Sequence, residues 1–82
     1  MQLSYDPRRN IAYLRLRMAA GAEIETVRLS DELNVDLAPD GTVYGIELLN
    51  ANEQLRGGDG GLLVLVDEAA GHRVEVPLPE VA

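Results

Sequence analysis

Apolar and polar residues alternate along most of this chain with a period of two. In the segment 11–18, IAYLRLRM, every second residue from Ala12 to Met18 is apolar, and a tyrosine and two arginines lie between them. The segment 33–37, LNVDL, alternates in the same way. A period of two is typical of a β-strand with one buried face. We therefore predict a chain built mainly from strands.

Turn residues separate these strands from their neighbours. Asp6-Pro7 favours a turn between a first strand at 2–5 and the strand at 11–18, and Pro39-Asp40-Gly41 favours a type I turn closed by a left-handed glycine. Turns of this length join antiparallel neighbours. The remaining predicted strands are 23–29, 42–49, 62–66 and 72–79. The expected fold is mainly β, an antiparallel meander of about six strands with a marginal α component.

One short helix is expected near residues 51–56, where Asn50 or Asn52 could cap its first turn. The sequence GGDGG at 57–61 ends this helix and has the composition of a flexible hinge. We expect one domain over 1–82, with a main sheet at 1–56, the hinge at 57–61 and a C-terminal hairpin at 62–79. The hinge could let that hairpin exchange between two copies.

The stretch LNVDLAPDGTVYGIELLNA, 33–51, superficially resembles a calcium loop. The match fails because Ala38 and Pro39 stand where oxygen ligands are needed. Alternation on both sides of the turn indicates a hairpin instead. Within it, Gly45 leaves room on one face of its strand for another backbone or a bulky side chain.

The chain has more apolar strand surface than one short helix can cover. The segment LLVLV is apolar on both faces, and apolar residues also occur on the face predicted to be outer. A homodimer built from sheet packing or strand exchange would cover them. The residues proposed for this interface are Ile11, Tyr13, Val43, Leu49, Leu63 and Leu65.

Composition excludes several kinds of site. The 82 residues include 14 acidic residues, seven arginines, no lysine and no cysteine, and the formal charge is −7. This charge disfavours nucleic acid, although Arg8, Arg9, Arg15 and Arg17 could form a local basic face. Without cysteine there is neither a disulfide framework nor a thiolate site, and no run approaches the roughly 20 apolar residues that cross a membrane. A cytoplasmic protein without a cofactor is expected.

No catalytic, cofactor-binding or metal-binding residue is predicted. Asp36 and Glu47 lie on facing strands, but we expect them to be solvated or paired with Arg15, Arg17 or Arg28. His72 is expected to be an exposed turn residue. Neither serine, Ser4 or Ser30, lies in a nucleophile-elbow context.

Two blocks of the sequence, YDPRRNIAYLRL and LNVDLAPDGTVYGIELLNANEQL, resemble a family of short bacterial and archaeal proteins, domain of unknown function 2283. The resemblance covers Leu3 to Leu55, and Arg8-Arg9 depart from its pattern. It implies a small antiparallel sheet with a short helix, and no activity or functional residue. The matching positions are Tyr5, Asp6, Pro7, Tyr13, Asp40, Gly41, Gly45, Ile46, Glu47, Leu49, Asn50 and Ala51.

These observations favour a small, non-catalytic protein-binding or regulatory module that acts as a homodimer, with a second small protein as its partner. The alternative is a small enzyme or ligand-binding protein, with a site at the dimer interface around Tyr13, Tyr44 and the arginines.

Overall fold

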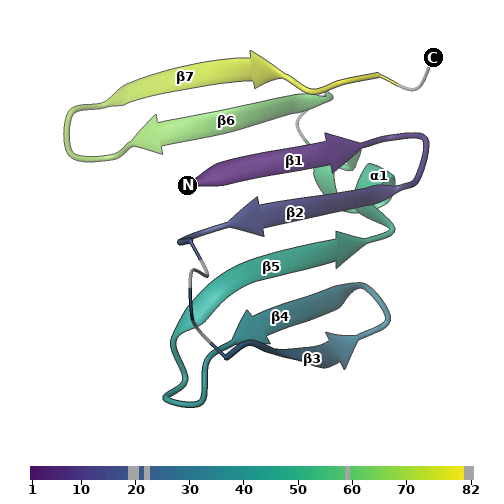
Figure 1. Cartoon of the computed structure of the whole chain (residues 1–82). Helices are drawn as coiled ribbons and strands as arrows, with labels where there is room; N and C mark the ends of the chain where they lie inside the picture. Colours follow the sequence, from purple (N-terminus) through teal and green to yellow (C-terminus); the bar gives the residue numbers. More distant parts are fainter. Residues whose placement is uncertain (19–20, 22, 59, 81–82) are drawn as a thin grey trace.

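The computed structural model describes residues 1–18, 21, 23–58 and 60–80. Within these residues the fold has seven strands and one short helix (Figure 1). The elements are β1 (Gln2–Asp6), β2 (Ile11–Arg15), β3 (Glu25–Ser30), β4 (Leu33–Leu37), β5 (Val43–Leu49), α1 (Ala51–Arg56), β6 (Leu62–Asp67) and β7 (His72–Pro77).

Five strands form one antiparallel sheet in the order β1-β2-β5-β4-β3. The prediction of a mainly β, antiparallel fold with one short helix is confirmed. The sheet contains a hairpin, β1-β2, and a meander, β3-β4-β5, which are joined where β2 pairs with β5. Alternation identified the strands, but it carries no information about this long-range pairing.

Each strand of the sheet contributes an apolar residue to one row across it. Leu3 pairs with Leu14, Leu14 with Ile46, Ile46 with Val35, and Val35 with Val27. We call this row, which consists of Leu3, Leu14, Ile46, Val35 and Val27, the sheet face. All five of its members are only half-buried.

The opposite side of the sheet is polar, because strand neighbours point to opposite faces. Tyr13 pairs with Glu47, and Glu47 pairs with Asn34. The predicted core side of the strands at 33–37 and 42–49 is confirmed, since Val35 and Ile46 lie in the sheet face. Strand β2 ends at Arg15 rather than at Met18, although the Leu16 N–H still donates to the Tyr44 carbonyl at 2.9 Å.

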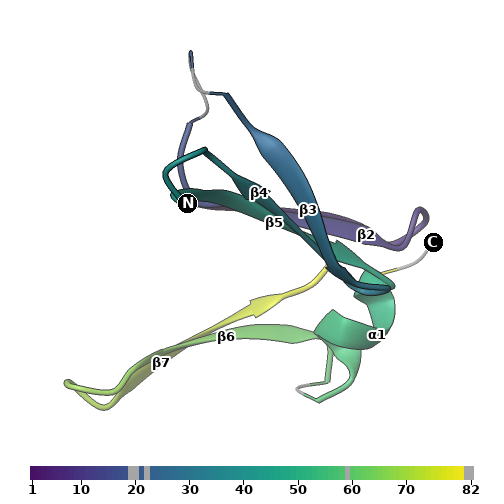
Figure 2. The ribbon, with the colours of Figure 1, turned by 90° about the horizontal axis from the view of Figure 1, so that it is seen from below.

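The helix α1 spans the predicted residues and lies at one end of the sheet, and β6 and β7 form a separate two-stranded sheet. Figure 2 shows that this hairpin leaves the neighbourhood of α1 and diverges from the five-stranded sheet, so that its tip reaches beyond the end of the sheet. Among the described elements, the hairpin makes its main contact outside itself with α1.

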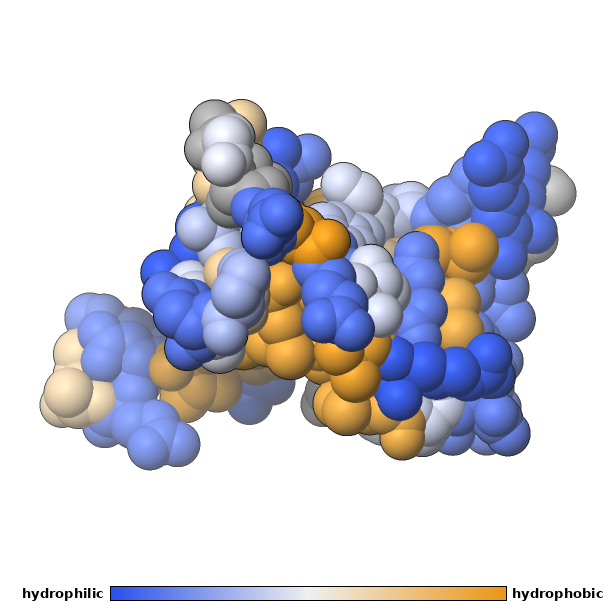
Figure 3. All heavy atoms as spheres, turned by 60° about the horizontal axis from the view of Figure 1, so that its bottom comes forward, coloured by the Kyte–Doolittle hydropathy of each residue, from blue (hydrophilic) through white to orange (hydrophobic). Residues whose placement is uncertain are grey.

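Very little of the described chain is fully buried. The buried apolar residues are Ala12, Ala51 and Leu78, and two of these are alanines. Larger apolar side chains, among them Leu65, Val74 and Val76, are about half exposed or more. Figure 3 shows apolar surface in the middle of the molecule, between polar margins. The fold therefore has its strands in place without a closed core.

Candidate functional site

Hydrogen bonds join the two blocks of sequence that resemble the family. The Tyr5 hydroxyl donates to Asn52 Oδ1 at 2.5 Å, and Asn52 Nδ2 donates to the Pro7 carbonyl at 3.0 Å. Asn52 thus connects the first strand and its turn to the helix. The motif residues Tyr5 and Pro7 have a structural role in this arrangement.

The start of α1 is capped by a residue from the first hairpin. Asn50 occupies the N-cap position with a φ of 57°, but its side chain caps no backbone group. Instead, Asn10 Oδ1 accepts a hydrogen bond from the Asn52 N–H at 2.7 Å, and the Asn10 carbonyl accepts one from the Ala51 N–H at 3.1 Å. Asn50 takes the predicted N-cap position, but the capping side chain comes from Asn10. No local sequence signal could show this, because a cap normally comes from the residue just before the helix.

The polar side of the sheet carries a hydrogen-bonded cluster centred on Asp36. Its carboxylate accepts a bond from the Tyr13 hydroxyl to Oδ2 and another from the Thr26 hydroxyl to Oδ1, each 2.7 Å long. The Tyr13 ring lies over Gly45, where a Cβ atom would fall 2.0 Å from the Tyr13 hydroxyl oxygen. The prediction that a bulky side chain uses the space at Gly45 is confirmed.

This cluster raises the pKa of Tyr13 to about 12. The hydrogen bond to Asp36 is the main cause, followed by burial and by repulsion from the Asp36 and Glu47 carboxylates. Tyr13 therefore acts as a firm hydrogen-bond donor at neutral pH, whereas a tyrosine serving as general base would need a lowered pKa.

Neutral donors, rather than arginines, hold the two carboxylates considered for catalysis. Glu47 accepts a hydrogen bond from Asn34 Nδ2 at 2.9 Å, and Asp36 is bonded by Tyr13 and Thr26. Of the two expected alternatives, solvation or pairing with Arg15, Arg17 or Arg28, the pairing was wrong, because Arg15 bonds Gln2 and Arg28 bonds Asp31. Both carboxylates already have ordered partners, which is the arrangement of a structural cluster.

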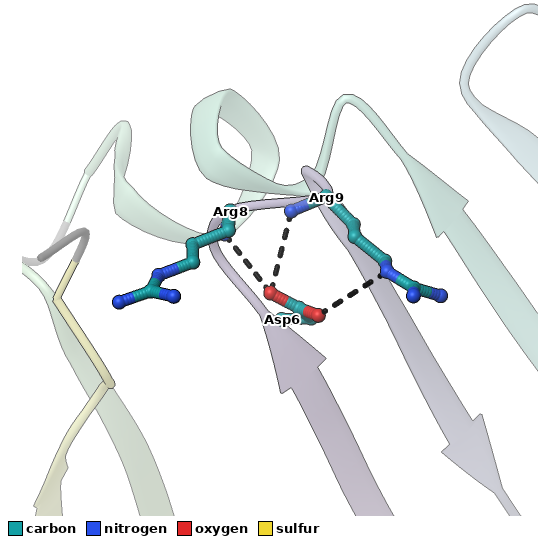
Figure 4. Close-up of polar contacts among 3 residues, drawn as sticks. All are labelled: Asp6, Arg8 and Arg9. Atoms are coloured by element: carbon teal, nitrogen blue, oxygen red, sulfur yellow. Dashed lines mark hydrogen bonds and ion pairs between the residues drawn. The ribbon is translucent and has the colours of Figure 1, made fainter.

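Asp6 organises the turn between β1 and β2 (Figure 4). Its Oδ1 accepts hydrogen bonds from the N–H groups of Arg8 at 3.0 Å and Arg9 at 3.3 Å, and Arg9 Nε lies 3.8 Å from its Oδ2. Asp67 holds the turn between β6 and β7 in the same way, through the N–H groups of Ala69 and Ala70. The two hairpins thus share one turn design.

The turn at 38–42 is confirmed as a hairpin connection. The Gly41 N–H donates to the Ala38 carbonyl at 2.9 Å, and Gly41 has a φ of 87°. Asp40 Oδ1 accepts the Thr42 N–H at 2.9 Å. Hydrogen bonding by the Thr42 side chain and then by its backbone lowers the pKa of Asp40. The Asp40 carboxylate, which suggested a metal loop, forms hydrogen bonds that hold the turn together.

The arginines do not form one basic face. Arg8 and Arg9 lie in the turn before β2, whereas Arg15 lies at the other end of that strand. The Arg17 guanidinium lies 5.9 Å from the centroid of the Tyr44 ring. Tyr44 lies at a register shift between β4 and β5, because Gly45 pairs with Asp36 and Val43 pairs with Leu37.

Several further expectations concern catalysis or metals. His72 is exposed at the start of β7, and the Ser30 hydroxyl accepts a hydrogen bond from the Glu32 N–H. Within the described part of the chain, no group of three or more histidine, aspartate or glutamate residues could hold a metal ion. An open hollow of about 410 Å³ lies beside β1 and β2 and includes Ser4, Asp6 and Tyr13 in its lining. Its tyrosine and carboxylates belong to the structural bonds already described.

The predicted interface residues fall on two separate surfaces. Ile11, Tyr13 and Leu49 belong to the polar side of the sheet, where Ile11 pairs with Leu49, whereas Val43 lies beyond a register shift and pairs with Leu37. Leu63 and Leu65 lie on one face of the hairpin, where they pair across the strands with Val76 and Val74. The first group is half-buried or barely exposed, whereas Leu65 is 67% exposed.

Comparison with known proteins places the chain in a family. The model of the family described as "Protein of unknown function (DUF2283)" matches residues 2–52, and the chain belongs to that family. Searches of curated proteins and of solved structures found no match. No helix in the described residues has the length and apolarity that a membrane crossing requires.

Proposed function

We propose that this member of the DUF2283 family is a non-catalytic protein-binding or regulatory module of the cytoplasm that acts as a homodimer. The observation that supports the proposal most strongly is the amount of surface the single chain leaves exposed. The chain exposes 5916 Å², whereas a compact monomer of 8.9 kDa is expected to expose about 4,800 Å². The excess, about 1,100 Å², exceeds the roughly 800 Å² that each partner buries in a standard interface.

The shape of the chain supports the same conclusion. Its radius of gyration is 14.3 Å, whereas a compact domain of this length is expected to have one of about 12 Å. The described residues bury no large side chain completely. A domain of this size is only marginally stable even with a complete core. Association would supply the burial that the isolated chain lacks.

The chemistry of the polar side supports a non-catalytic role. Tyr13, Asp36 and Glu47 are the side chains best suited to acid-base work, and each is held by an ordered partner in a cluster without a deep cavity. The cluster links four neighbouring strands, in the order β2, β5, β4 and β3. Its residues therefore have a sufficient structural explanation.

Two measurements test the proposal. Light scattering after gel filtration should give the mass of a dimer, and a strict monomer at tens of micromolar would remove the argument from uncovered surface. Co-purification from the native cell, followed by mass spectrometry, should recover a stoichiometric second protein. Repeated absence of such a protein would contradict the protein-binding part of the proposal and leave the dimer standing.

A further inference from the structure

The hairpin carries an apolar face that the described part of the chain leaves largely exposed. Leu63 pairs with Val76 and Leu65 pairs with Val74, so these four side chains share one face, which we call the hairpin face. Their exposed fractions are 43% for Leu63, 67% for Leu65, 54% for Val74 and 48% for Val76. The opposite side of the hairpin carries Leu62, Val64 and Val66 on β6, and on β7 it carries Arg73 and Glu75, which form an ion pair at 3.6 Å.

Exposure along the hairpin face increases away from the body of the molecule. The Leu78 N–H donates to the Gly61 carbonyl at 2.8 Å and extends the ladder by one pair, which places Leu78 on the same face as Val76. Leu78 is only 8% exposed, Val76 is 48% exposed and Leu65, nearer the tip, is 67% exposed. The face is therefore covered where the hairpin begins and uncovered where it diverges from the sheet (Figure 2).

Within the described residues, no second layer of similar size packs on the sheet face. Its five side chains form one apolar row across all five strands and remain half-buried, and the helix of six residues lies at one end of the sheet. Among the described elements, neither strand of the hairpin makes a main contact with the sheet. Each chain thus has two apolar surfaces, the hairpin face and the sheet face, which do not pack on each other.

We propose that a second copy of this chain covers both surfaces, with the hairpin face of each chain packed on the sheet face of the other about a twofold axis. This inference rests on the proposed homodimer and deepens it by naming the two surfaces. The hairpin tip reaches beyond the end of its own sheet, as this arrangement requires (Figure 2). A twofold contact buries the hairpin face and the sheet face of both copies at once.

The second copy fits the surfaces better than an unrelated protein does. The area in excess of a compact monomer, about 1,100 Å² per chain, matches the burial of a stable dimer. The hairpin face and the sheet face are both apolar. The ion pair of Arg73 and Glu75 lies on the other side of the hairpin, where it stays in solvent. The polar cluster around Asp36 also stays outside, on the far side of the sheet.

Charged substitutions on the two sides of the hairpin test the proposal. Leu65→Asp and Val74→Asp place a carboxylate in the proposed interface, and Val66→Asp is the matched control, because Val66 is 52% exposed on the opposite side of the same hairpin. We expect the first two variants to raise the dimer Kd by roughly 30-fold or more, as for an interface hot spot. The control should change it by no more than about threefold.

The outcomes separate this inference from the proposed function. If the unaltered chain is a dimer and both Leu65→Asp and Val74→Asp dimerise as tightly as it does, the named surfaces are wrong and the homodimer stands. If Val66→Asp weakens the dimer as much as Leu65→Asp does, the assignment to the hairpin face is overturned. A chain that is monomeric alone and gains mass only with a different protein overturns this inference and the homodimer, and it leaves the protein-binding part of the proposed function standing.

Thiol accessibility supplies a readout that does not require a charged variant to fold. The chain has no cysteine, so Leu65→Cys and Val66→Cys each carry a single thiol. As protein concentration rises through the dimerisation range, the reaction of a thiol reagent with Leu65→Cys should slow at least tenfold, and that with Val66→Cys should stay constant. Equal rates at every concentration for Leu65→Cys would contradict the proposal.

Discussion

Asn10 and Asn52 are 42 positions apart, and the Asn10 side-chain oxygen accepts the backbone N–H of Asn52 at 2.7 Å. The same asparagine donates through Nδ2 to Asn50 Oδ1 at 3.2 Å. This contact fastens the first hairpin to the start of α1. Both Asn10 and Asn50 adopt positive φ angles, 60° and 57°, so the junction uses backbone conformations that asparagine tolerates better than most residues.

Replacing Asn10 should therefore destabilise the fold through two separable effects. Asn10→Ala should lower the free energy of unfolding by about 2–3 kcal/mol, because it loses the cap and places a Cβ-bearing residue without a polar side chain at positive φ. Asn10→Gly should recover about 1 kcal/mol, because glycine accepts the backbone angle and loses only the side-chain bonds. Urea denaturation measures both, and equal stability of Asn10→Gly and the unaltered chain would show that the cap contributes nothing.

The contact of Tyr13 with Gly45 predicts the effect of one added methyl group. Gly45→Ala should lower the free energy of unfolding by about 1–3 kcal/mol, because the Tyr13 ring must move away from Asp36. Thermal denaturation measures the loss. Gly58→Ala is the matched control, since nothing lies within 4 Å of the added Cβ, and its effect should stay within about 0.5 kcal/mol.

A second variant isolates the contact itself. In a Tyr13→Ala background, Gly45→Ala should lose most of its cost, because the ring that it displaces is absent. An undiminished cost in that background would show that the substitution acts on the backbone instead of on Tyr13.

The raised pKa of Tyr13 predicts alkaline sensitivity. The folded protein holds the phenolic proton more tightly than the unfolded chain does, because an ionised Tyr13 would lose its bond to Asp36 and face that carboxylate. Its contribution to stability is therefore complete below the ordinary pKa of 10.0 and is lost as pH rises to about 12. Urea denaturation across this range should show a decline that Tyr13→Phe lacks. Identical pH profiles for the two proteins would contradict this account.

Local alternation predicted most of the strands, and candidate capping residues followed by glycines predicted the helix. The strand Leu33–Leu37 and the helix Ala51–Arg56 have the predicted bounds. Gly45 indicated a close approach, and the approaching group is Tyr13, on the neighbouring strand. These features depend on the periodicity and turn chemistry of a few adjacent residues, which the sequence displays directly.

The features that the sequence could not display depend on distant partners. The cap by Asn10 joins residues 42 positions apart, and the bond of Tyr13 to Asp36 joins residues 23 positions apart. Solvation or arginine pairing was expected for Asp36 and Glu47, yet Thr26 and Asn34 bond them because these donors lie directly opposite in the register. The separation of Ile11 from Leu65 onto different surfaces likewise follows from three-dimensional placement.

The central claim is that two copies cover each other, and sedimentation equilibrium of the unaltered chain at several salt concentrations tests it most directly. We predict a mass of twice 8.9 kDa, with a dimer that tightens as salt rises, because each copy carries a charge of −7 and an apolar interface gains from screening. A monomer mass at every protein and salt concentration would contradict the account.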